Sequence, residues 1–391
     1  MKTRGIILIT FLSILPLLGL IHPGLPVTHD GQDHVARIAN FFLSLTEGNL
    51  VPRWAENLNW GYGHPIMMFL YPLPSYMASI FHLFGLGFVD STKIVFAVSF
   101  IFSGIFMYLW LSEFLGEIPA ISGAILYNFA PYRFVDLYVR GAIGEHVAFI
   151  FPPLVAYFIL KLSKKNKRHK WYIVGLALST ACLILAHNAM SLMFLPFLFV
   201  YAIYLFLLNR NFVFLGKSIG GIALGFLLSA FFWIPAFLEG RYTLRDIVVG
   251  DEVFKRFVDV PSLIYGPWSY GITGQFSVQV GILQWVAFLF SIPILFIAYK
   301  KNKNIFILLC ITLIYFLGSL FIMLPVSTFV WKSISIIQKF QFPWRFLSIS
   351  VFSIAIIGAV VMDYIPKKLQ SILLILMLAF LAIFNRDYWL P

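Results

Sequence analysis

Acidic residues, histidines and arginines gather in a few short segments of this chain, which has only 16 acidic residues among 391. Residues 28–37 contain Asp30, Asp33, His34 and Arg37. One aspartate could take a proton from a hydroxyl group, as a general base does. Alternatively, both aspartates could serve only as helix N-caps, with Arg37 pairing with Asp33 at i+4. The segment therefore predicts either a catalytic carboxylate or a capped helix start.

A second group of ionisable residues directly precedes an apolar run. Its members are Arg133, Asp136, Arg140, Glu145 and His146. Arg140 could hold a phosphate, because guanidinium forms strong paired hydrogen bonds with phosphate oxygens. Glu145 begins the apolar run, where a helix N-terminus stabilises a carboxylate that could assist in this role. The alternative is structural pairing of Arg133 with Asp136 and of Arg140 with Glu145 at the membrane edge.

Three smaller groups complete the candidate set for substrate binding. His64 lies in the sequence WGYGHP at 60–65, and His187 with Asn188 separates two apolar runs. Arg345 follows Phe-Pro-Trp at the start of another run and could contact a lipid phosphate. Alternatively, each group could serve only as an interfacial anchor or a helix cap.

Composition places the elements that position these residues in a membrane. The chain is 61% hydrophobic and 11% charged, far fewer charges than soluble domains carry. Its net charge of +12 comes largely from lysines in short loops, as membrane orientation requires, so nucleic-acid binding is not expected. Cys182 and Cys310 each fall within an apolar run, where a disulfide between them is not expected.

The apolar runs predict an all-α, polytopic bundle of about eleven transmembrane helices. The lysine-rich loops at 161–170, 300–303 and 367–368 are placed in the cytoplasm by the positive-inside tendency. This orientation requires that one of four upstream candidates, 6–21, 65–87, 93–113 and 118–133, does not cross. Residues 65–87 contain three prolines, so we interpret this segment as broken and not spanning.

This topology predicts a single multi-pass domain over residues 1–391 in the cell membrane, with a cytoplasmic N-terminus and extracytoplasmic candidate residues. The outer loops are predicted at 22–90, 132–146 and 239–279, and the first apolar run as an uncleaved helix. An amphipathic pattern at 38–45 favours an interfacial helix in the first loop. Arginine is enriched outside and lysine inside, which favours an anionic ligand on the outer face.

The same motifs resemble the GT-C superfamily of membrane glycosyltransferases, and most closely the prokaryotic membrane family labelled 6-pyruvoyl-tetrahydropterin synthase-related. The resemblance rests on HDGQDHVARI at 29–38, PRW at 52–54, WGYGHP at 60–65, FAPYRFVDLYVRGAIGEH at 129–146 and FPWRF at 342–346. It extends over nearly the whole chain. Nothing in the sequence resembles a soluble pterin enzyme.

The resemblance implies a GT-C-like fold and transfer of a sugar from a polyprenyl-phosphate donor to an acceptor outside the cytoplasm, with inversion. Asp30 or Asp33 would be the catalytic base, and Glu145 the second acid. No cofactor is required, and a divalent cation is optional, since the adjacent acidic pair of the best-known branches is missing. Donor lipid and membrane lipid are the implied partners; sugar, acceptor and protein partners are left open.

Two other classes of function compete with a transferase. A transporter or lipid flippase would carry ionisable residues halfway along its helices, together with broken helices in matching halves. A noncatalytic scaffold for cell-envelope assembly would need none of the acids. In this sequence the charged residues are predicted at the outer helix ends, which favours the transferase.

Overall fold

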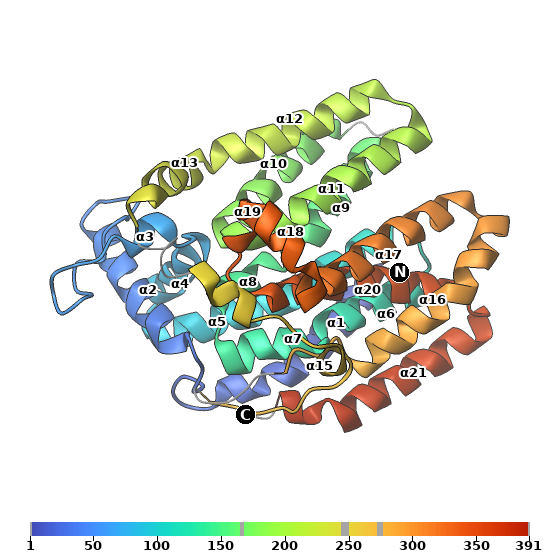
Figure 1. Ribbon diagram of the computed structural model, residues 1–391, viewed down its shortest axis with the longest axis horizontal. Helices are drawn as coiled ribbons and strands as arrows, with labels where there is room; N and C mark the ends of the chain where they lie inside the picture. Colours follow the sequence, from blue (N-terminus) through green and yellow to red (C-terminus); the bar gives the residue numbers. More distant parts are fainter. Residues whose placement is uncertain (1, 165–167, 244–249, 272–276, 390–391) are drawn as a thin grey trace.

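The computed structural model describes residues 2–164, 168–243, 250–271 and 277–389, and within these ranges it is helical (Figure 1). Residues 244–249 and 272–276 of the predicted third outer loop lie outside the described residues. Long apolar stretches form the helices because a chain in hydrocarbon must satisfy its backbone hydrogen bonds internally.

Nine helices within the described ranges are long and apolar enough to span a membrane. They are α1 with its 3-10 extension η1 (Lys2–Ile14, Leu15–Ile21), α5 (Phe88–Leu111), α8 with α9 (Ile143–Ala148, Phe151–Ser163), α10 (His169–Ala186), α11 (Asn188–Asn209), α16 (Ile282–Lys301), α17 (Lys303–Met323), η6 with α20 (Pro343–Phe346, Leu347–Tyr364) and α21 (Lys367–Phe384).

The described residues thus contain nine candidate spans, or ten with one bent pair, where the sequence predicts about eleven passes. Helices α12 (Phe212–Leu228) and α13 (Ala230–Glu239) meet at a bend of 66° and together are apolar enough for one span. Helix α6 (Glu117–Asn128) has only 12 residues. It nevertheless joins the two ends of the bundle, because the Gly116 amide donates to Asp363 at the end of α20, and Phe129 O accepts from Asn385 after α21.

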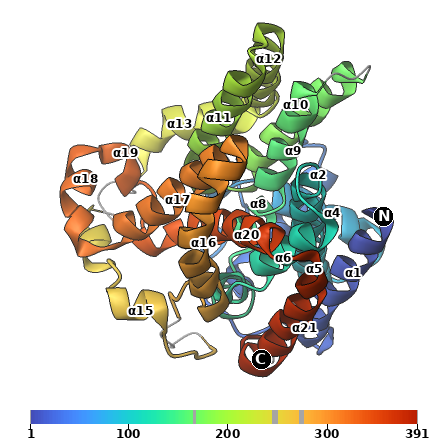
Figure 2. The same ribbon diagram turned by 90° about the vertical axis from the view of Figure 1, so that its right-hand side faces the viewer.

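Helix α20 lies at the centre of the bundle, and 89% of its most apolar window is buried inside the protein (Figure 2). It packs closely on α6 because glycines face the contact from both sides. A Cβ on Gly123 would lie 2.9 Å from Ala355 O, and one on Gly358 would lie 2.2 Å from a methyl carbon of Leu126. The core is therefore built around a helix that directly follows η6, the turn that contains the candidate residue Arg345.

The two ends of the bundle differ in their charged residues. At one end, here named the Lys-rich end, Lys2, Lys161 and Lys164 converge on the carboxylate of Glu113. The loop that joins α16 to α17 lies at this end too, since Tyr204 near the end of α11 donates to Asn304 O. The described parts of the predicted loops at 161–170 and 300–303 thus share one end of the molecule, and the Gly116–Asp363 hydrogen bond brings the end of α20, just before Lys367, to the same end.

The opposite end, here named the site end, carries the short helices of the first loop (Figure 1). Helix α2 (Gly31–Thr46) buries His34, Ile38 and Phe41 on one face, as the amphipathic pattern predicts. Residues 65–87 form α3 (Ile66–Phe69) and α4 (Leu73–Leu83), separated by a break before Pro72. Neither is long enough to span, and α4 packs on α2 and α5. The segment is broken and is not one of the spans, as the prolines predict.

The remaining short elements also cover the site end. They are α7 (Pro131–Phe134), the π-helical turn η2 (Val135–Arg140), η3 (Gly240–Tyr242), η4 (Gly250–Lys255), α15 (Val260–Ile264), η5 (Pro325–Ser327), α18 (Thr328–Ser333), α19 (Ser335–Gln338) and η7 (Arg386–Tyr388). Four sequence-distant segments are therefore available to build a site there.

Candidate functional site

The first and second predicted outer loops are joined backbone to backbone beside Asp30. The amide of His29 donates to Val139 O at 3.0 Å, and the amide of Asp30 donates to Arg140 O at 2.8 Å. These two bonds fix Asp30 relative to Arg140, although the residues come from different loops.

A glycine makes this close approach of the two loops possible. Gly141 ends the π-helical turn with a φ of +66°, in the left-handed region that favours glycine. A Cβ there would lie 2.4 Å from the Thr28 hydroxyl oxygen and 3.0 Å from the amide nitrogen of Gly31. The sequence Arg140-Gly141 thus places the arginine where the first loop can dock on it.

Asp30 occupies the N-cap position of α2, but its side chain makes no capping hydrogen bond. The hydroxyl of Thr28 accepts from the Gly31 amide instead, at 3.2 Å. The carboxylate of Asp30 is therefore not used to cap the helix, and it faces a cavity.

Glu145 holds two arginines from distant parts of the chain. Its Oε1 accepts from Arg140 Nη2 at 2.9 Å and from Arg345 Nε at 2.7 Å, while its Oε2 accepts from the Tyr132 hydroxyl at 2.7 Å. All four side chains are buried. A carboxylate with three strong donors is stabilised as an anion, and here it orients both guanidinium groups.

Asp136 is the second carboxyl group that contacts Arg140. Its Oδ1 accepts from Arg140 Nη1 at 2.6 Å, and its Oδ2 is buried without a hydrogen-bond partner. Burial, followed by the nearby charge of Glu145, raises the pKa of Asp136 well above its usual range. Because burial disfavours the ionised form of Asp136, its pairing with Arg140 is weakened, and the guanidinium group suits an anionic ligand such as phosphate.

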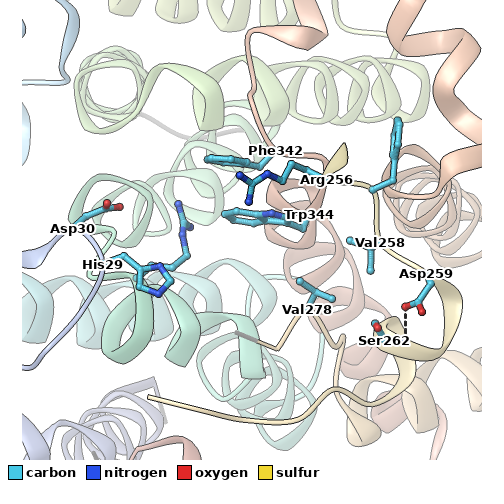
Figure 3. A pocket seen from close by; sticks show the side chains of 11 residues that line it. His29, Asp30, Arg256, Val258, Asp259, Ser262, Val278, Phe342 and Trp344 are labelled. Carbon is cyan, nitrogen blue, oxygen red and sulfur yellow. Dashed lines mark hydrogen bonds between the residues drawn. The ribbon is translucent and has the colours of Figure 1, made fainter. Parts of the chain in front are cut away.

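A cavity of about 710 Å³, here named the Asp30 cavity, opens beside this cluster (Figure 3). Its lining includes Asp30 and Arg140 from the first two outer loops, and residues of the third loop on the far side. The lining residues are His29, Asp30, Arg140, Arg256, Phe257, Val258, Asp259, Ser262, Val278, Phe342 and Trp344. A carboxylate and a guanidinium group therefore share one space large enough for a sugar phosphate.

One wall of the Asp30 cavity is a stack of two aromatic rings between two arginines. The rings of Phe342 and Trp344 are parallel, with centroids 4.7 Å apart (Figure 3). The guanidinium carbon of Arg140 lies 4.6 Å from the Trp344 ring centroid, and that of Arg256 lies 5.9 Å from the Phe342 ring centroid. The motif Phe-Pro-Trp-Arg thus supports Arg140 through Trp344 as well as Glu145 through Arg345.

Two histidines of the candidate set lie behind the ion pairs and are neutral. Burial, with the charges of Arg37 and Arg140, lowers the pKa of His34 to about 3. Burial likewise lowers the pKa of His187 to about 3. His187 Nδ1 accepts from the Met190 amide at 3.3 Å and caps α11, while its Nε2 lies 4.0 Å from Glu145 Oε1.

Tyr71 lies in the same centre, although it was not among the sequence candidates. Its ring packs on the backbone of Gly144, where a Cβ would lie 2.0 Å from Tyr71 Cε2, and on the His187 ring at a centroid distance of 4.7 Å. Burial, then the carboxylate of Glu145, raises the pKa of Tyr71, so the phenol stays protonated. Among the described residues its hydroxyl has no hydrogen-bond partner, which leaves a donor for a ligand.

Arg133 and His146 are not part of this centre. Arg133 is fully buried, with its guanidinium carbon 4.0 Å from the Phe149 ring centroid and a hydrogen bond of 2.9 Å to the Ser103 hydroxyl. His146 is buried between the rings of Phe96 and Phe100. Both predicted substrate contacts lie in the core, and Asp136 pairs with Arg140 rather than with Arg133.

Four other candidates also lie away from the Asp30 cavity. The Asp33 side chain is 67% exposed and pairs with Arg37 on the same face of α2, at 3.3 Å. His64 is exposed, and its backbone pairs with Ala55. Asn188 is exposed and donates weakly to Phe69 O, at 3.4 Å. The structure therefore brings Asp30, Arg140, Glu145 and Arg345 together and leaves these four outside the centre.

A divalent cation fits this arrangement poorly. In the part of the chain that the structure describes, no three His, Cys, Asp or Glu side chains are grouped as a metal site. Both oxygens of Glu145 already accept from tyrosine or arginine donors, so they would have to leave these donors to bind a cation.

The fold is that of GT-C glycosyltransferases. ArnT from Cupriavidus metallidurans, solved bound to undecaprenyl phosphate, is similar with a TM-score of 0.55 and 12% identity, over 97% of this chain and 64% of that one. The apo oligosaccharyltransferase from Archaeoglobus fulgidus is similar with a TM-score of 0.52 and 12% identity, over 100% of this chain and 55% of that one. At such identities the similarity shows the fold alone, and the chemistry has to be inferred from the residues of the site.

Residues 68–389 match the family of membrane proteins described as the 6-pyruvoyl-tetrahydropterin synthase related domain, and the chain belongs to that family. An uncharacterized protein of Lactococcus lactis subsp. cremoris is 25% identical over 348 residues. That match covers 83% of this chain and 54% of the relative, so the chain spans about half the length of that curated relative.

Proposed function

We propose that this protein is a membrane glycosyltransferase, which moves a sugar from a polyprenyl-phosphate donor to a hydroxyl acceptor at the site end. One observation carries the proposal: Asp30 and Arg140 line the same cavity, with their backbones hydrogen-bonded to each other. A base and an anion-binding group at fixed separation are the two parts that displacement from a phosphate-linked sugar requires.

The proposed reaction is a single displacement with inversion. The acceptor oxygen attacks the anomeric carbon, its proton passes to the carboxylate of Asp30, and the bond from that carbon to the phosphate oxygen breaks. The bonding electrons leave with the polyprenyl phosphate. General-base assistance of this kind contributes about 10²- to 10⁴-fold in rate.

The departing phosphate would bind Arg140, which lines the Asp30 cavity beside Asp30. Arg345 does not line the Asp30 cavity; it donates to Glu145 and to Phe340 O, so we assign it a positioning role. Tyr71 does not line the Asp30 cavity either, but its hydroxyl has no hydrogen-bond partner among the described residues, unlike the Arg345 guanidinium group, so we propose that it donates to the sugar or phosphate once a ligand is bound. ArnT, which shares the fold, was solved with undecaprenyl phosphate, and this supports a lipid phosphate as the ligand class here.

The orientation is also part of the proposal. The Lys-rich end carries the basic loops, and the positive-inside tendency would place it in the cytoplasm with the N-terminus. The Asp30 cavity would then open on the extracytoplasmic side. The observed ion pairs Arg140–Glu145 and Lys161–Glu113 lie at opposite ends of the bundle, which favours a transferase over a transporter with charges midway.

The test compares Asp30→Asn with Asp33→Asn in proteoliposomes that contain undecaprenyl-phosphate-linked hexoses and a panel of hydroxyl acceptors. Sugar transfer is measured by mass spectrometry, and undecaprenyl phosphate binding by native mass spectrometry. Asp30→Asn should lower kcat about 10²-fold or more, because the base is lost while the amide keeps its shape. It should leave lipid binding nearly unchanged.

Asp33→Asn is the matched control, because Asp33 stands on the same helix and only pairs with Arg37. It should transfer sugar at nearly the wild-type rate. Equal rates for both variants and the wild type would refute Asp30 as the base, and an inability of the wild-type chain to bind undecaprenyl phosphate would refute the donor class.

A further inference from the structure

A second cavity, of about 640 Å³, lies at the Lys-rich end and has no part in the proposed reaction. It is formed where α9, α11 and α17 come together with the start of α12. Its lining residues are Phe114, Leu160, Ser163, Lys164, Tyr201, Tyr204, Leu205, Leu208, Asn209, Asn211, Asn302, Asn304, Ile305 and Leu308. We name it the Lys164 cavity.

The lining of the Lys164 cavity has an apolar part and a polar rim. Leu205, Leu208, Ile305 and Leu308 supply aliphatic walls from α11 and α17. The rim consists of four asparagines at the ends of α11, α12, α16 and α17, and all four are exposed. Such a division matches an amphipathic ligand with its head at the rim and its hydrocarbon along the helices.

The side-chain amides of two rim residues, Asn211 and Asn302, use their oxygens and leave their NH₂ groups available. The side-chain oxygen of Asn211 accepts from the Phe214 amide at 3.1 Å, and that of Asn302 accepts from the Asn304 and Ile305 amides at 3.2 Å. Since the oxygens are used as helix caps, the NH₂ groups point elsewhere. In the described ranges these NH₂ groups have no hydrogen-bond partner, so they can donate to an acceptor-rich ligand.

The charge around the cavity is positive. Lys164 lines it and donates to both the backbone oxygen and the carboxylate of Glu113. Lys2 and Lys161 share the same carboxylate. Three ammonium groups around one carboxylate leave an excess of positive charge at the mouth, which favours an anionic head group.

We propose that the Lys164 cavity binds the phosphodiester head group of an anionic phospholipid from the leaflet at the Lys-rich end. Basic pockets between transmembrane helices on the cytoplasmic side bind anionic head groups in this way. The lipid chains would lie along Leu205, Leu208 and Ile305. The bound lipid would brace α11 against α17, which are already linked there by the bond from Tyr204 to Asn304 O. This proposal stands whether or not the protein transfers sugar.

The experiment measures lipid binding to the purified full-length chain by native mass spectrometry and by the thermal unfolding midpoint. The probes are phosphatidylglycerol, phosphatidylcholine of the same chain length, and inorganic phosphate. We expect phosphatidylglycerol to bind and raise the midpoint, and the other two to have little effect. Equal effects of the two lipids, or an equal effect of inorganic phosphate, would overturn the proposal of an anionic lipid.

Two variants remove the charge and the space separately. Lys164→Gln should weaken phosphatidylglycerol binding about fivefold, since one lysine near an anionic head group is worth about 1 kcal/mol. Leu208→Trp keeps every charge and fills the cavity, so it should abolish the specific binding while the chain folds.

Lys301→Gln is the matched control, because Lys301 is exposed at the same end and does not line the cavity. It should bind phosphatidylglycerol as tightly as the wild type. A loss as large as that of Lys164→Gln would show binding to general surface charge and would overturn the site, as would unchanged binding in Leu208→Trp.

Discussion

Arg133 and Arg140 come from the same outer loop, and both are buried, but their surroundings are opposite. Arg140 lines the Asp30 cavity and contacts two carboxylates, a tyrosine and the Trp344 ring. Arg133 is enclosed by the rings of Phe100, Tyr127 and Phe149 and has one hydrogen bond, to Ser103. A buried arginine is therefore a ligand contact only where the structure also gives it a cavity.

Replacing each arginine by methionine separates the two roles most strongly. Arg140→Met should lower kcat about 10²- to 10³-fold, the usual effect of removing a donor that stabilises developing charge. Arg133→Met should leave kcat near the wild-type value and change only the thermal unfolding midpoint, because no ligand reaches it. Transfer in proteoliposomes, normalised to folded protein, measures the first effect, and differential scanning fluorimetry the second.

Equal losses of kcat in both variants would break the comparison, because they would place Arg133 in contact with the substrate. Glu145 and Asp136 lose a partner in Arg140→Met, so its folding must be checked by the same unfolding measurement. Rescue by Arg140→Lys to an intermediate rate would point to charge as the quantity lost, since lysine keeps the charge without the paired donors.

Tyr71 tests whether residues near Arg140 that do not line the Asp30 cavity also contact the ligand. Tyr71→Phe should lower kcat about tenfold, because a neutral hydrogen bond made in the transition state is worth about 1.5 kcal/mol at most. Tyr76→Phe is the control: Tyr76 lies in α4, five residues after Tyr71, and its hydroxyl donates to Leu50 O, so kcat should not change. Sugar transfer with both variants decides this, and no loss in Tyr71→Phe would exclude its hydroxyl from the site.

The sequence predicted the fold well because its signals are local. Apolar runs, lysine-rich loops and the prolines of residues 65–87 each report on their own segment, and together they predict a helical multi-pass bundle. The predicted count of about eleven passes exceeds the nine candidate spans of the described residues, or ten with the bent pair, because the run at 118–133 forms a helix of only 12 residues. The motif at 29–38 likewise predicted an amphipathic helix, which the structure contains as α2.

The pairing within the site was not predictable in the same way. Arg133 and Arg140 look equivalent in sequence, and only the π-helical turn and the left-handed Gly141 direct them to different surroundings. The rings around Arg133 come from α5, α6 and the end of α8, which no local pattern connects to it. The only sequence feature that marks Tyr71 is its place in the proline-broken segment 65–87. That feature predicts a segment that does not span the membrane, and it does not predict a contact with the site.

His34 provides the smallest effect, on stability rather than on rate. Its pKa is about 3 in the folded protein, below the ordinary value of 6.5, because burial beside Arg37 and Arg140 disfavours the charged ring. The unfolded chain therefore binds more protons between pH 6.5 and 3, so the free energy of unfolding falls as pH falls below 6.5. Each such histidine contributes a slope of about 1.4 kcal/mol per pH unit in this range.

His34→Gln should reduce this slope by about 1.4 kcal/mol per pH unit, which corresponds to one proton. His187→Gln should do the same, because the pKa of His187 is also about 3. Unfolding by SDS in mixed micelles, measured from pH 7.5 to pH 5, gives the slopes. The double variant should lose both contributions. If His34→Gln kept the wild-type slope, water would have to reach His34 in the folded protein, and the surroundings of Arg140 would be more open than its burial in the structure indicates.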